Sequence, residues 1–179
     1  MKLEPLMRLR VRLGRRYPIG PTPKGRRSVW THEGGEVEGP GIRGEVAPVG
    51  GEFELIDGEG VYHVDVRLVI RTHDGANIFV QYFGVSALSE AVREKYSRGE
   101  AAAFGENYFV TQPRFETSHP DYRHLNTTMA IAEGRVLPDG VEYLVYRAVA
   151  TTPAAGEVAD RFRDRRGALN DDVQDGGGA

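Results

Sequence analysis

The chain has 179 residues, a formal net charge of −3 and no cysteine. This length suits a single domain, and the 40% of hydrophobic residues are enough to form a buried core. The missing thiol rules out disulfides, thiolate catalysis and cysteine-ligated zinc, and the small net charge gives no general attraction to nucleic acid or an anionic membrane. No apolar run precedes Arg8, and none reaches the roughly 18 residues of a membrane span. We therefore expect a cytoplasmic protein with no membrane partner.

Alternation of apolar and polar residues predicts short strands along most of the chain, separated by glycine and proline turns. The predicted strands are 6–13, 26–31, 36–49 (bent or bulged), 52–56, 61–72, 77–83, 108–117, 127–136 and 141–150. A proline-rich loop is expected at 17–25 and a turn at 50–51, whereas 87–98 has helical spacing and 120–125 suits one helical turn. The pattern favours a mainly-β barrel or sandwich over residues 1–150. Residues 151–179 are expected to form an extension, helical at 156–166 and disordered from 171.

The central hairpin predicts a cluster of polar side chains. A two-residue turn at Asp74 and Gly75 would place Arg67 opposite Tyr82. Directly opposed residues share a face, so Asp65, Arg67 and Tyr82 would gather at one end of one face. Two interpretations stay open at this point. The face lines a barrel lumen with a few convergent polar groups, or it is the solvated outer face and Asp65–Arg67 is a surface pair worth less than about 1 kcal/mol.

Several stretches resemble the family known as domain of unknown function 3237 (DUF3237, also UPF0311). The similarity spans roughly residues 3–150 in order, and its most specific part is Pro113-Arg114-Phe115-Glu116-Thr117, followed by Tyr122, Leu125 and Asn126 and closed by Tyr143 and Val145-Tyr146. Other matching stretches are 3–9, 20–27, 34–40, 44–46, 64–67 and 71–75.

This resemblance implies a single antiparallel β-barrel of the calycin-like or allene-oxide-cyclase-like kind, with one or two short helices, that forms a homodimer. It implies little about chemistry. Two departures from the family pattern stand out. The family often has an Asp-Trp pair where this chain has Glu52 and Phe53, and residues 86–106 form a helix-like insertion suited to a lid or an additional dimer contact.

Three carboxylates, those of Glu52, Asp65 and Glu116, are candidates for acid/base chemistry, because an apolar barrel raises the pKa of an enclosed carboxyl group toward neutrality. We predict that Glu52 or Asp65 moves a proton and that Arg67 stabilises developing negative charge. The predicted substrate-binding residues are Tyr82, Tyr108, Arg114, Glu116, Asn126 and Tyr146. For each there is a structural alternative: an ion pair for the charged residues, a packed wall for the tyrosines, and a bridge between a turn and a strand for Asn126.

The preferred functional hypothesis is an enzyme that acts on a small organic molecule by isomerisation, cyclisation, hydration or elimination, without a cofactor or metal. The histidines do not supply a full set of metal ligands at any local spacing, and the N-terminal arginines lack the interleaved aromatics of a nucleic-acid site. A second hypothesis is a non-catalytic carrier or sensor with the same barrel. A third is an oligomerising scaffold whose interior is fully packed.

Overall fold

The computed structural model describes residues 1–151, and the helix predicted at 156–166 and the disorder predicted from 171 lie outside the described residues. Contacts group Leu3–Val149 into one compact unit. Its strands are β1 (Lys2–Thr22), β2 (Gly25–Gly39), β3 (Ile42–Glu52), β4 (Leu55–Ile56), β5 (Tyr62–Thr72), β6 (Asn77–Ala87), β7 (Tyr108–Glu116), β8 (Ala130–Leu137) and β9 (Gly140–Val149). Helix α1 (Glu90–Ser97) follows β6, and the 3-10 helix η1 (Pro120–Thr127) follows β7.

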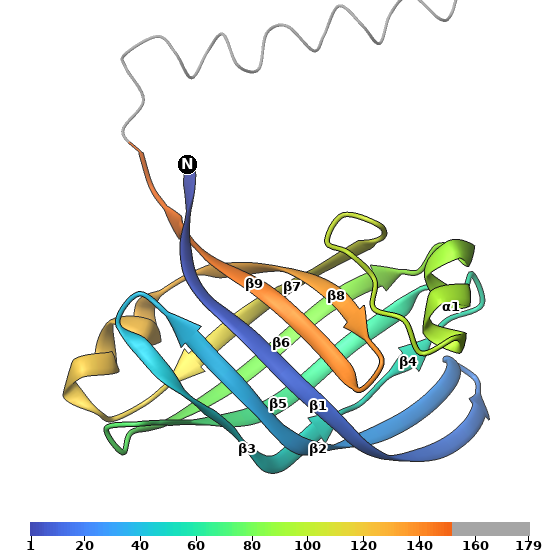
Figure 1. Ribbon diagram of the computed structural model, residues 1–179, viewed down its shortest axis with the longest axis horizontal. Coiled ribbons are helices and arrows are strands. Elements are labelled where there is room, and N and C mark those ends of the chain that lie inside the picture. The colour runs from blue at the N-terminus through green and yellow to red at the C-terminus, as the bar shows by residue number, and fades with distance from the viewer. Residues whose placement is uncertain (152–179) are drawn as a thin grey trace, which may run out of the picture. The chain divides into compact units, whose positions relative to one another are not determined.

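The strands form one closed antiparallel barrel (Figure 1). The order around the sheet is β1-β9-β8-β7-β6-β5-β3-β2, and β2 pairs again with β1 to complete the ring. The short β4 pairs with both β2 and β5. The predicted mainly-β barrel with short helices is confirmed.

The segment predicted as a loop at 17–25 belongs instead mostly to β1, which continues to Thr22. Proline removes a backbone donor, so a strand that contains it needs a local irregularity. Register shifts between Leu13 and Arg16 and between Pro18 and Gly20 provide this irregularity, and Pro18 still lies opposite Ser28 of β2. The turn predicted at 50–51 is likewise wrong, because both glycines belong to β3 and pair with residues of β5.

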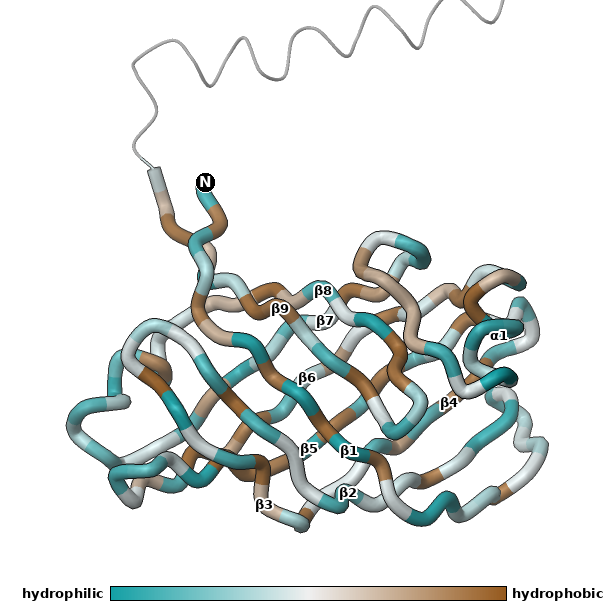
Figure 2. The backbone as a smooth tube through the Cα atoms, in the orientation of Figure 1, coloured by the Kyte–Doolittle hydropathy of each residue, from teal (hydrophilic) through white to brown (hydrophobic). Residues whose placement is uncertain are grey.

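Buried and more exposed residues alternate along strands such as β5 and β7. Hydrophobic and hydrophilic residues alternate in the same way along the backbone (Figure 2). Tyr122 and Leu125 of η1 belong to the same buried cluster as Ile70 and Ile78, which lie at the neighbouring ends of β5 and β6. The barrel is therefore packed solidly at the η1 end. At the opposite end, beside α1, the interior contains a cavity, which rules out the fully packed scaffold.

The central hairpin has a register one residue away from the predicted one. Thr72 accepts from the amide of Gly75 (3.0 Å) and donates its own amide to Ala76 (2.9 Å), so three residues rather than two form the loop, and Gly75 adopts φ +91°. This longer loop pairs Val66 with Tyr82 and Arg67 with Gln81. Because a one-residue slip reverses the face of a side chain, Tyr82 points inward whereas Asp65 and Arg67 lie on the outer face.

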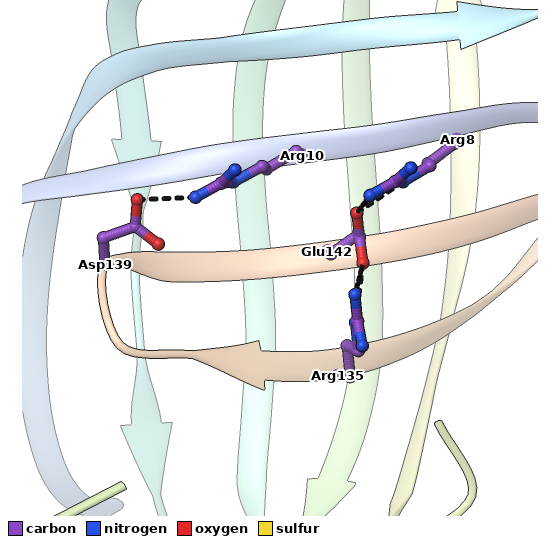
Figure 3. A network of polar contacts seen from close by, with 5 residues as sticks. All are labelled: Arg8, Arg10, Arg135, Asp139 and Glu142. Atoms are coloured by element: carbon purple, nitrogen blue, oxygen red, sulfur yellow. Dashed lines mark hydrogen bonds and ion pairs between the residues drawn. The ribbon is translucent and has the colours of Figure 1, made fainter. Parts of the chain in front are cut away.

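One carboxylate on the outer face of the barrel is fully covered by protein. Glu142 of β9 is 1% exposed and lies between Arg8 of β1 and Arg135 of β8, with Arg135 Nε donating to Glu142 Oε2 at 2.6 Å (Figure 3). Phe104 packs under the Arg135 guanidinium, 4.7 Å from it, in a segment that bonds to β8 through the Ala102 amide and the Val136 carbonyl. Glu142 thus joins three neighbouring strands through charge-assisted hydrogen bonds.

Replacing Glu142 with glutamine is expected to lower the free energy of unfolding by about 1–3 kcal/mol, because the buried carboxylate that binds the guanidinium groups of Arg8 and Arg135 becomes a neutral amide. Urea unfolding of both proteins measures the change. Asp139→Asn is the matched control, since the Asp139–Arg10 pair at 2.8 Å is open to solvent and is worth at most about 1 kcal/mol. Equal losses in the two variants would contradict the role assigned to Glu142.

Candidate active site

The interior cavity has a volume of about 510 Å³, which is in the range of small-molecule sites. Its apolar wall includes Leu13, Ile56, Val64, Phe109, Val136 and Val141. Its polar lining includes Arg16, Ser28, Glu52, Glu54, Tyr62 and Ser86. Leu88 and Tyr96 also contribute, so the inserted segment around α1 borders the cavity.

Glu52 is the acid that the sheet places inside this cavity. It is the last residue of β3 and pairs with Trp30 on β2 and with Val66 on β5. Opposed residues share a face, and Val66 is 1% exposed in the core whereas Trp30 lines the cavity. The Glu52 side chain therefore points inward, and the limited surface that it retains faces the cavity.

The surroundings of Glu52 favour its protonated form. Burial, and to a smaller extent the neighbouring Glu54 carboxylate, together raise the pKa of the Glu52 carboxyl group to about 7. Glu54 lies two residues after Glu52, just beyond the end of β3, and lines the same cavity, which explains the repulsion between the two carboxylates. A carboxyl group with a pKa near 7 can both accept and donate a proton at neutral pH.

Two buried phenols lie next to Glu52. The rings of Tyr82 and Tyr143 meet edge-to-face at 5.2 Å, and Tyr143 packs in the same way against Phe109 of the cavity wall at 5.3 Å. Burial raises the pKa of both phenols, and the Glu52 carboxylate raises both further, so the two hydroxyl groups stay protonated. The two hydroxyl groups interact with each other, since each tyrosine shifts the pKa of its neighbour, and no other described residue hydrogen-bonds to either of them. Neither side chain lines the cavity itself, so the two phenols form the packed wall behind Glu52.

A second set of polar side chains, centred on Arg16, lines the cavity at the end next to α1, which we call its opening. Arg16 Nη2 contacts Glu54 Oε1 at 3.3 Å, and Arg16 Nε donates to Ser28 Oγ at 3.0 Å. The guanidinium also lies over the Trp30 ring, 5.4 Å from its centroid. Burial raises the pKa of Tyr62, and the Glu54 carboxylate raises it further, whereas the cations of Arg93, Arg26 and Arg16 oppose the shift.

Two of the three predicted catalytic residues lie away from the cavity. Asp65 and Arg67 form the surface pair that was the alternative interpretation, with Arg67 Nη1 2.6 Å from Asp65 Oδ1. The Arg67 guanidinium packs against the rings of Phe53 and Phe83 on the outer face. We therefore do not propose Asp65 or Arg67 as catalytic residues.

The predicted substrate-binding residues separate in the same way. Tyr82 lies inside, next to Glu52, but Tyr108 and Tyr146 border a shallow groove of about 280 Å³ on the outer face of β7 and β8. Arg114 and Glu116 are exposed on β7. Asn126 bridges η1 to the end of β7, since its amide accepts from the Thr117 backbone N–H and donates to the Thr117 carbonyl, both at 2.9 Å. That bridge is the structural alternative given for Asn126.

The sequence did not single out four residues of the cavity: Arg16, Glu54, Tyr62 and Trp30. Arg16 lies after the register shifts in β1, where the alternation of the strand is broken, and Glu54 lies between β3 and β4. The signal in the sequence that could have indicated Glu54 is its spacing from Glu52, since the two acids are separated by one residue. Tyr143 was noted only as part of the family pattern.

Among residues 1–151, no three His, Asp or Glu side chains come together as a possible metal site. Neither helix in this part of the chain has the length and apolar character needed to cross a bilayer.

The fold and the cavity define a class, a closed antiparallel β-barrel with an acid-lined internal cavity. The model of the family "Protein of unknown function (DUF3237)" matches residues 1–148, and the chain belongs to this family. It is 38% identical over 92 residues to UPF0311 protein RPA1785 of Rhodopseudomonas palustris, a match that covers 51% of this chain and 60% of that relative. It is 32% identical over 121 residues to UPF0311 protein blr7842 of Bradyrhizobium diazoefficiens, covering 68% of this chain and 79% of that relative.

Solved structures share the fold. The crystal structure of RPA1785, described as a conserved protein of unknown function, matches with a TM-score of 0.76 and 30% identity over 83% of this chain and 99% of that chain. A β-barrel-like protein from Acinetobacter baumannii matches with a TM-score of 0.70 and 29% identity, covering 82% and 94% of the two chains.

Proposed function

We propose that this protein is an enzyme that uses Glu52 as its acid/base group on a small organic molecule bound in the barrel cavity. The observation that carries the proposal is a carboxyl group with a pKa of about 7 lining a 510 Å³ cavity. Groups with a pKa near the working pH are the most effective proton-transfer catalysts, and such shifts cluster at functional sites.

The chemistry that fits these residues is proton transfer at a carbon next to a carbonyl group. The Glu52 carboxylate takes the proton, the electron pair of the broken C–H bond moves to the carbonyl oxygen, and Glu52 becomes a neutral acid. Return of this proton to a different atom completes an isomerisation, and its delivery to a leaving oxygen completes an elimination. Tyr62 and Ser86 line the cavity and carry hydroxyl groups suited to donate to the developing oxyanion.

The test is solvent deuterium exchange, because it reports proton abstraction before the natural substrate is known. Bicyclic ketones such as 2-tetralone are incubated with the protein in D₂O, and loss of the α-proton signal is followed by NMR. We expect the wild-type protein to accelerate the exchange, with a rate that rises as pH increases through about 7, the pKa of the Glu52 carboxyl group. Glu52→Gln should lose about 100-fold or more of this rate.

Glu45→Gln is the matched control for this experiment. Glu45 lies on the same strand, but it is exposed on the outer face and pairs with Arg71 at 3.1 Å. Its replacement should leave the exchange rate unchanged. Ligand binding without any exchange across the ketone panel would favour the carrier or sensor instead. The homodimer and the cytoplasmic location stay predictions.

A further inference from the structure

Arginines from three elements meet at the α1 end of the cavity. Arg16 of β1 and Arg26 of β2 line it, and Arg93 belongs to α1, which borders the same end (Figure 1). Each of the three lies close enough to Tyr62, another lining residue, to lower the pKa of its phenol. The three guanidinium groups therefore lie within electrostatic range of one phenol of the cavity lining.

Only one of these cations is paired with an acid in the described part of the chain. Arg16 contacts Glu54 at a single distance of 3.3 Å, and within residues 1–151 neither Arg26 nor Arg93 has a carboxylate within 4.0 Å. On the outer face, by contrast, Arg8 and Arg10 each pair with an acid. Glu54 and, when it is ionised, Glu52 offset two of these three charges. The α1 end of the cavity thus keeps an excess of positive charge, which attracts an anion.

The wall behind the arginines is apolar and aromatic. Trp30 faces the cavity with Arg16 over its ring, and Phe109 and Val64 continue the wall toward Glu52. Such a wall accommodates a ring system, whereas guanidinium groups form paired hydrogen bonds to the oxygens of an oxyanion. The two requirements describe a molecule with an apolar body and one charged end.

We propose that the ligand of this cavity is an organic oxyanion, whose ring body lies against Trp30 and Phe109 and whose anionic group is held at the opening by Arg16, Arg26 and Arg93. The inference rests on the proposed function for the identity of the site and adds its substrate class. It orients the molecule with the anion outward and the reacting carbon toward Glu52.

A pair of fluorescent probes tests the proposal. 1-Anilinonaphthalene-8-sulfonate carries an anionic group, and N-phenyl-1-naphthylamine has the same ring body without it. Trp30 is the only tryptophan of the chain and lines the cavity, so its fluorescence follows probe binding, and the arginine variants distinguish the cavity from the rest of the surface. We expect the wild-type protein to bind the sulfonate at least about tenfold more tightly than the neutral probe, and added salt to reduce this preference.

Substitutions of single arginines test whether these residues cause the tighter binding of the sulfonate probe. Arg26→Gln and Arg93→Gln remove exposed side chains without an ion-pair partner in the described part of the chain, so both should fold normally. Each should weaken sulfonate binding about three- to tenfold and leave the neutral probe unaffected. Arg71→Gln, on the outer face, is the control and should change neither.

Competition by 1-naphthoate and 1-naphthyl phosphate then separates a carboxylate from a phosphate ester, since the better competitor identifies the anionic group. Equal binding of the two probes, or full sulfonate affinity in both variants, overturns the proposal. The Glu52→Gln variant separates the anionic ligand from the acid/base role of Glu52, because it should lose proton exchange and retain sulfonate binding. Anion selectivity in a wild-type protein that never exchanges an α-proton would refute the catalytic proposal alone.

Discussion

Replacing Glu52 with glutamine is expected to stabilise the protein at pH 8.5 and to leave its stability nearly unchanged at pH 4. In the folded protein the pKa of the Glu52 carboxyl group is about 7, against a usual value of 4.5. The folded state therefore holds this proton more tightly than the unfolded state, and ionisation of Glu52 costs stability as pH rises from about 4.5 to 7. Above pH 7 the cost is complete.

The size of the effect follows from the pKa difference. One pKa unit corresponds to about 1.4 kcal/mol, so the full shift is worth roughly 3 kcal/mol, and we expect about 2 kcal/mol because the cavity leaves part of the carboxylate solvated. Glutamine keeps the shape of the side chain and cannot ionise. Urea unfolding at several pH values between 4 and 8.5 measures the difference between variant and wild type.

The exposed Glu45 is again the control. Glu45→Gln removes a solvated pair with Arg71 and should change stability by less than about 1 kcal/mol at any of these pH values. A Glu52→Gln variant whose stability relative to wild type is independent of pH would show that Glu52 ionises normally, and it would remove the main support for an acid/base role. The expected gain also has a functional meaning, since a residue that lowers stability is retained where activity requires it.

The regular alternation of the strands was sufficient to predict a barrel or a sandwich, and the family resemblance then indicated the barrel. Residues 61–72 and 108–117 read clearly as strands, and β5 (Tyr62–Thr72) and β7 (Tyr108–Glu116) match them closely. Helix α1 was predicted from its spacing and from Gly99. What alternation cannot supply is the irregularity within a strand, and for this reason Pro18 and Pro21 suggested a loop in a segment that stays paired with β2.

The candidate site depended on a detail that pattern cannot fix, the length of one turn. A two-residue loop at Asp74 and Gly75 would place Asp65, Arg67 and Tyr82 together, but the Thr72 amide bonds to Ala76 and the loop has three residues. This one-residue change moved two predicted catalytic groups to the outer face. Glu52 was predicted independently, from the family resemblance, and its placement in the cavity does not depend on that hairpin.

Replacing Gly50 with alanine is expected to disrupt the barrel where it presents Glu52. Gly50 adopts φ +92°, a conformation that strains other residues, and a Cβ atom at this position would lie 2.1 Å from the backbone oxygen of Arg67. This oxygen belongs to β5, the strand that pairs with β3 on either side of an irregularity between Val46 and Gly50. Neither strand can move away without breaking several ladder hydrogen bonds.

We expect Gly50→Ala to lower the free energy of unfolding by more than about 3 kcal/mol, since backbone strain and a backbone clash add. Thermal unfolding followed by circular dichroism measures the loss. Gly58→Ala is the matched control, because a Cβ atom there meets nothing within 4 Å, and its effect should stay within about 0.5 kcal/mol. An unchanged melting temperature for Gly50→Ala would mean that β3 does not approach β5 as closely as described. The inward direction of Glu52, two residues further along β3, would then lose its structural basis, because its pairing with Val66 continues the same ladder.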